Sequence, residues 1–74
     1  MNPLEIAARR ASQVRLLIAQ HRRLIEYLEA EGDAAPIAEA RRMLPRMEQL
    51  LRSMEEEVVA EAAKAQAKET PIPT

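Results

Sequence analysis

The sequence predicts an all-α protein, a two-helix antiparallel hairpin with helices over about residues 3–31 and 34–68. Apolar residues recur at helical spacing in both halves of the 74-residue chain. The strongest break in this pattern, Gly32 followed by Asp33 and Pro36, separates the two halves. The chain is also rich in Ala, Leu, Glu and Arg and holds a single glycine, a composition that favours helix.

The first helix has a recognisable start. Asn2 can accept hydrogen bonds from the first-turn amides, and Pro3 suits the first helical position. Glu5 stands three residues after Asn2, as in a capping box. The helix therefore begins at about residue 3.

One face of this first helix is apolar, in positions a, d and g of a seven-residue repeat that starts at Leu4. The a positions are Leu4, Ala11, Ile18 and Ile25, the d positions are Ala7, Val14, His21 and Leu28, and Leu17 and Leu24 occupy g. His21 is the polar interruption of this stripe. Tyr27 falls at c, on the outer face.

The turn is predicted to be short. Gly32 can adopt the left-handed conformation that ends a helix, and Asp33 can cap the next one. Pro36 then falls in the first turn of the second helix, where its missing N–H costs no needed hydrogen bond.

The second helix repeats the design of the first. Its stripe comprises Ile37, Leu44, Leu51, Val58 and Ala65 at a, Ala40, Met47 and Met54 at d, and Met43 and Leu50 at g. Two equal stripes joined by a short loop should face each other in antiparallel fashion. Pro45 lies inside this helix at the outward b position and is expected to bend it without ending it.

The last part of the chain has fewer large apolar side chains that could pack against the first helix. Residues 60–68 hold good helix formers but no large apolar side chain, so this end is expected to fray. The closing Thr-Pro-Ile-Pro-Thr cannot continue a helix, and residues 70–74 are predicted to form a disordered tail. Residues 1–69 then form a single domain.

Composition and charge exclude several classes of protein. The formal net charge of −1 gives no global attraction to nucleic acid or to an anionic membrane. No apolar run approaches the roughly 18 residues of a membrane span, and the opening Met-Asn-Pro-Leu-Glu does not resemble a secretion leader. The absence of cysteine is compatible with a reducing compartment. We expect a cytoplasmic protein with no membrane partner.

No pattern in the sequence indicates catalysis. Ser12 and Ser53 have no His–carboxylate framework around them, and there is no glycine-rich phosphate loop, metalloprotease motif or cysteine nucleophile. We therefore expect a non-enzymatic protein with no cofactor and no metal.

The core of such a hairpin is thin, because Tyr27 is the sole aromatic residue and the stripes are too wide for two helices to cover, particularly at position g. A second copy should close the core as a four-helix bundle, with a dimer as the first expectation and a different protein partner as the alternative. The expected interface residues are Val14, Leu17, Ile18, His21, Leu24, Ile25, Leu28, Ile37, Met43, Leu44, Met47, Leu50, Leu51, Met54 and Val58. This pattern predicts a self-associating interaction or adaptor module.

The charged residues support this pairing of the helices. Arg9 and Arg10 are expected to lie opposite an acidic run late in the second helix, Glu55, Glu56, Glu57 and Glu61, and to help select the register. Folding should also gather five arginines near the turn: Arg22, Arg23, Arg41, Arg42 and Arg46. They are either a solvated face whose guanidinium groups pair with nearby glutamates or an anion patch. The anion patch defines the alternative function, a small nucleic-acid-associated regulator, although no aromatic residues interleave with the arginines.

His21 needs a hydrogen-bond partner or water at its place in the apolar stripe. A single polar residue in such a seam can fix register or oligomer state, and an imidazole can also respond to pH near neutrality. Metal ligation is disfavoured because the chain has one histidine and no carboxylate at metal-ligand spacing in the same seam.

The run Leu24-Ile25-x-x-Leu28-Glu29-x-x-Gly32-Asp33, continued by Ala40, Leu44, Met47-Glu48 and Leu51, resembles a set of short uncharacterised bacterial helical-hairpin proteins. The resemblance covers about residues 14–54, and Pro36 and Pro45 depart from it. It implies a hairpin fold and a bacterial source, and it carries over no activity and no functional residue.

Overall fold

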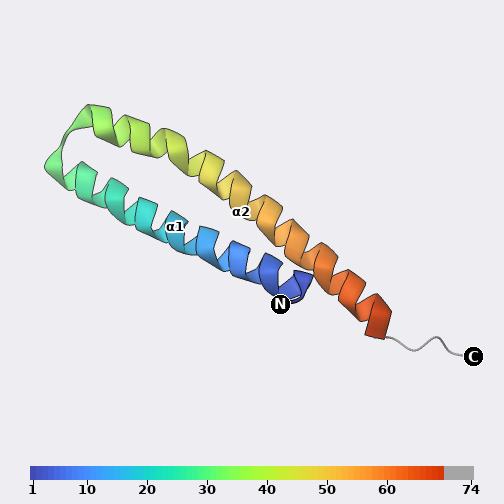
Figure 1. Cartoon of the computed structure of the whole chain (residues 1–74). Helices are drawn as coiled ribbons and strands as arrows, with labels where there is room; N and C mark the ends of the chain where they lie inside the picture. The colour runs from blue at the N-terminus through green and yellow to red at the C-terminus, as the bar shows by residue number, and fades with distance from the viewer. Residues whose placement is uncertain (70–74) are drawn as a thin grey trace, which may run out of the picture.

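The computed structural model describes residues 1–69 and contains two helices, α1 (Pro3–Glu31) and α2 (Ala34–Glu69). The helices run antiparallel along each other, so the start of α1 lies beside the later part of α2 (Figure 1). The predicted all-α hairpin is confirmed, with helix bounds within one residue of those expected. The predicted disordered tail, residues 70–74, lies outside the described residues.

The first turn of α1 is capped as the sequence predicts. The side-chain oxygen of Asn2 accepts a hydrogen bond from the Glu5 backbone N–H at 2.8 Å, and its amide nitrogen donates to the Glu5 carboxylate at 3.2 Å. The Asn2 carbonyl accepts from the Ile6 N–H at 3.1 Å. The bond to the Asn2 side chain satisfies the Glu5 N–H, a donor that a helix start otherwise leaves without a partner.

The turn between the helices rests on Gly32. Its φ of 78° is left-handed, and its N–H donates to the Leu28 carbonyl at 2.9 Å, which closes the end of α1. The expectation that the Asp33 side chain caps α2 is wrong, because within residues 1–69 its carboxylate accepts no hydrogen bond; the Asp33 backbone carbonyl makes the ordinary first bond of the helix, accepting from the Ile37 N–H at 3.4 Å. Pro36 stands three residues after Asp33 and removes one of the two N–H groups that a cap side chain bonds.

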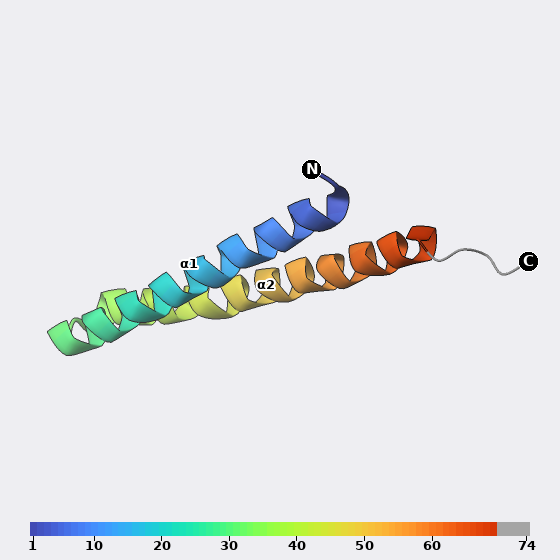
Figure 2. The same ribbon diagram turned by 90° about the horizontal axis from the view of Figure 1, so that it is seen from below.

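The core between the helices is narrow and built from small and branched residues. Its buried members are Ala7, Ala11, Val14, Ile18 and Ile25 of α1 and Ala40 of α2. Among the described residues no large side chain is fully buried, as expected of a thin core. The two helices cross at a small angle (Figure 2), and the alanines allow their backbones to approach closely.

α2 continues through Pro45, as predicted, and it is curved in Figure 1. Pro45 is exposed, so its ring lies on the outer side of the helix. Since proline has no N–H, the carbonyl of Arg41 loses its usual donor within the helix, a common cause of helix bending.

Candidate functional site

One long edge of the hairpin carries a ladder of ion pairs between the helices. Each successive pair lies seven residues further along α1 and seven residues earlier along α2. The pairs are Arg15–Glu55 at 3.1 Å, Arg22–Glu48 at 3.4 Å and Glu29–Arg41 at 2.6 Å. We call these six residues the ion-pair edge. Their side chains are about half exposed, so each pair contributes only a few tenths of a kcal/mol up to about 1, and together they fix the register.

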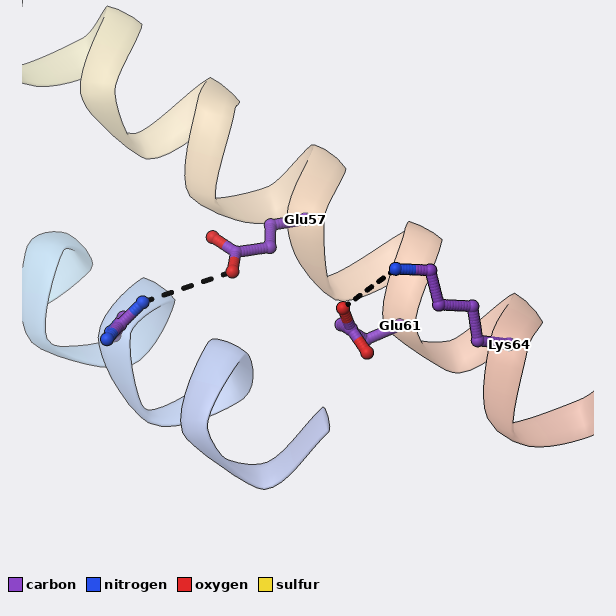
Figure 3. Close-up of polar contacts among 4 residues, drawn as sticks. Glu57, Glu61 and Lys64 are labelled. Carbon is purple, nitrogen blue, oxygen red and sulfur yellow. Dashed lines mark hydrogen bonds and ion pairs between the residues drawn. The ribbon is translucent and has the colours of Figure 1, made fainter. Parts of the chain in front are cut away.

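The opposite edge begins, at the open end of the hairpin, with a longer ion pair. Arg10 of α1 lies 3.9 Å from Glu57 of α2, and Figure 3 shows the Glu57 side chain extending toward α1, whereas the neighbouring Glu61 pairs with Lys64 within α2. The prediction that Arg10 meets the acidic run is confirmed. Arg9 forms no ion pair with any residue of the described chain.

From Arg10 and Glu57, steps of seven residues lead to a row of large apolar side chains. The row contains Leu17 and Leu24 on α1 and Met43 and Leu50 on α2, which are 52%, 45%, 48% and 47% exposed. We call these four residues the apolar edge. The Arg10–Glu57 pair sets the register, so Leu17 lies level with Leu50, and Leu24 lies level with Met43.

The predicted interface residues fall into three groups by exposure. The hairpin itself buries Val14, Ile18 and Ile25. A second group is half-buried: His21, Leu28, Ile37, Leu44, Met47, Leu51, Met54 and Val58. Only Leu17, Leu24, Met43 and Leu50 remain exposed. The hairpin thus covers most of its two stripes and leaves position g uncovered on both helices.

His21 finds a partner across the hairpin. Its Nε2 lies 2.6 Å from the carbonyl oxygen of Ala40, which can accept a hydrogen bond from the imidazole N–H. His21 is four residues after Leu17 and three before Leu24, so it lies on the side of α1 that carries the apolar edge. The contact ties α1 to α2 in one register, which agrees with a structural role. Within residues 1–69 no group of three His, Cys, Asp or Glu side chains could hold a metal ion.

Not all of the five arginines in the predicted anion patch are available to bind an anion. Arg22 and Arg41 belong to the ion-pair edge, with Glu48 and Glu29 as partners. Arg23, Arg42 and Arg46 are exposed and form no ion pair within the described part of the chain. Arg23 and Arg42 come directly after Arg22 and Arg41, which lie on the ion-pair edge. The next residue along a helix points to a different side, so Arg23 and Arg42 lie on the outer faces of two different helices.

Two hollows on the surface of residues 1–69 are shallow and open. One lies on the ion-pair edge, between Arg15–Glu55 and Arg22–Glu48, and the other lies at the open end near Asn2. Neither is lined by a serine, threonine, cysteine or histidine side chain. The most distinctive surface of the hairpin is therefore its apolar edge.

Comparison with protein-family models, with curated proteins and with solved structures finds no match in any of the three. The resemblance to bacterial hairpin proteins stays a prediction. Neither helix, over residues 1–69, is long and apolar enough to cross a membrane. The fold and the surface together define a class, an all-α hairpin with one ion-paired edge and one apolar edge.

Proposed function

We propose that this hairpin is a non-enzymatic protein–protein interaction module that self-associates by burying its apolar edge against a second copy. The observation that carries the proposal is the exposure of Leu17, Leu24, Met43 and Leu50, about half of each side chain, in one continuous row. Burying such area is the main favourable term in protein association.

A second copy suits this edge better than an unrelated partner does, for two reasons. The row has equal length on both helices, so a two-fold axis can lay it on itself, as symmetric dimers require. Charges at its open end are already neutralised within one chain by the Arg10–Glu57 pair, and no other charged residue interrupts the row. Two such edges can meet without burying an unpaired charge.

Sedimentation equilibrium of the intact chain and of Leu24→Glu tests the proposal. Full burial of a leucine is worth about 1.5–3 kcal/mol, so burying the exposed half is worth about 0.7–1.5 kcal/mol in each copy. A symmetric dimer loses this twice, and the dissociation constant should rise roughly 10- to 100-fold or more. Val59→Glu is the matched control, since Val59 is 70% exposed and lies away from the apolar edge.

The intact chain should sediment as a dimer, Val59→Glu should resemble it, and Leu24→Glu should shift toward monomer with its helical circular dichroism retained at high concentration. A highly helical intact monomer at micromolar concentration contradicts self-association. In that case the different protein partner predicted as the alternative becomes the better hypothesis.

Nucleic-acid binding remains the competing hypothesis. In it, phosphate groups would be contacted by the exposed arginines that form no ion pair within residues 1–69, namely Arg23, Arg42 and Arg46. Its discriminating measurement is a salt titration with duplex DNA and RNA, because phosphate contacts make binding fall steeply with salt. No retention at low salt is the result we expect. A cytoplasmic location and a bacterial source belong to this proposal as predictions of the sequence alone.

A further inference from the structure

We infer, on the basis of the self-association proposed above, that the two copies are related by a two-fold axis parallel to the helices. α1 of each copy then packs antiparallel against α2 of the other. The alternative, an axis perpendicular to the helices, places α1 against α1 and α2 against α2. Both give antiparallel neighbours in a four-helix bundle, so helix direction does not decide between them.

The residues beside the apolar edge distinguish the two arrangements. Each lies three or four positions from a member of the edge and so shares its side of the helix. They are Gln13, Gln20 and Tyr27 on α1 and Glu39, Arg46 and Ser53 on α2, all of them exposed. We call these six residues the polar flank. Any second copy that covers the apolar edge must also meet the polar flank.

A two-fold axis parallel to the helices does not shift residues along the bundle, so each residue has the same height in both copies. The Arg10–Glu57 register then brings Leu17 against the second copy's Leu50 and Leu24 against its Met43. Within one residue of this register, Gln20 faces the second copy's Arg46, Tyr27 faces its Glu39 and Gln13 faces its Ser53. Each of these flank pairs joins a donor to an acceptor, and none joins like charges. Electrostatic complementarity of this kind selects one partner geometry over another.

A perpendicular axis must pass midway between Leu17 and Leu24, and midway between Met43 and Leu50, to lay apolar residues on apolar residues. Arg46 then falls beside the second copy's Arg46, next to newly buried apolar surface, and Glu39 meets no cation. Like charges placed together at an interface disfavour it.

This arrangement also has a favourable contact, because Arg10 would meet the second copy's Glu31. The gain is small, since Arg10 already has Glu57 as a partner in its own chain. Under a parallel axis Arg10 keeps that partner and lies near a second Glu57. The balance of charges along the edge therefore favours the parallel axis.

Disulfide exchange between single-cysteine variants tests the axis against a clean background, because the chain contains no cysteine. Gln20→Cys and Arg46→Cys are prepared as full-length chains, mixed or kept apart, and equilibrated in a glutathione buffer. A parallel axis predicts that the mixture gives the mixed disulfide dimer and that each variant alone gives little covalent dimer. Gln49→Cys, on the outer face of α2, is the control for random collision.

Strong homodimers of Gln20→Cys alone and of Arg46→Cys alone, at least several-fold above the Gln49→Cys control, overturn the parallel axis in favour of the perpendicular one. No covalent dimer from any sample, while sedimentation still shows a dimer, overturns the inference and leaves self-association intact. No covalent dimer together with a monomer by sedimentation means that the proposed function itself has failed. The two failures are thus separated by the sedimentation run.

Discussion

Replacement of Gly32 by alanine isolates the energetic cost of the left-handed turn. A Cβ at this position would meet nothing within 4 Å, so the substitution creates no clash. The φ of 78° remains, and an L-residue in this conformation costs about 1–2 kcal/mol. Alanine also lowers the conformational entropy of the unfolded chain, which stabilises the folded state by about 0.4–1 kcal/mol. Gly32→Ala should therefore lower the free energy of unfolding by roughly 0.5–1 kcal/mol.

A chemically synthesised chain with D-alanine at position 32 is the matched control. The D-residue adopts positive φ without penalty, yet it restricts the unfolded chain about as much as L-alanine does. It should raise the free energy of unfolding by about 0.4–1 kcal/mol. The difference between the two variants then measures the backbone penalty alone, about 1–2 kcal/mol.

Thermal and urea unfolding, followed by far-ultraviolet circular dichroism, provide the measurement. Each kcal/mol corresponds to a shift of roughly 4–8 °C in Tm for a domain of this size. All three chains must be compared at one protein concentration, because self-association would add a concentration-dependent term. If the L- and D-alanine chains unfold at the same temperature, Gly32 does not hold a left-handed turn and the account of the hairpin connection is refuted.

Three further substitutions test the core and the edges. Ala11→Leu should lower the free energy of unfolding by about 1–3 kcal/mol, because Ala11 is 0% exposed at the contact between the helices. Ala8→Leu, at an exposed position, is the control. Equal urea midpoints for the two variants would contradict the close approach of the two helix backbones at Ala11. His21→Ala should cost about 1 kcal/mol through its lost hydrogen bond across the hairpin, and an unchanged urea midpoint would mean that this bond is not made. Glu48→Gln should change stability by less than about 0.5 kcal/mol at low salt and less still at 1 M salt, because its partner Arg22 is half exposed; a larger loss would show that the ladder does more than set the register.

The ends of α1 were predictable because they depend on local chemistry. Asn2, Pro3 and Glu5 form a start signal within one turn, and Gly32 supplies a conformation that few residues can adopt. The error at Asp33 has a similarly local cause. The sequence shows a good capping residue, but Pro36 at the third helical position has no N–H, which removes a donor that the cap would use.

The ion-pair edge could have been read more fully from the sequence. Arg15, Arg22 and Glu29 recur every seven residues along α1, and Arg41, Glu48 and Glu55 recur every seven along α2. In antiparallel order these two series are complementary at every step. Arg15 was nevertheless absent from the predicted pairs, which rested on blocks of like charge and not on the seven-residue spacing of single charges.

The sequence predicted which stripe residues are covered least, because position g lies at the margin of each stripe. Positions a, d and g together span a wider arc than one neighbouring helix covers, so some apolar side chains must remain outside. The pattern places Ile18 at a and Leu17 at g, and the structure leaves Ile18 4% exposed and Leu17 52% exposed. Ile18 at position a faces α2, whereas Leu17 at position g lies at the side of the contact that is opposite the ion-pair edge. Leu17 and Leu24 of α1 and Met43 and Leu50 of α2 therefore stay exposed along the same edge of the hairpin.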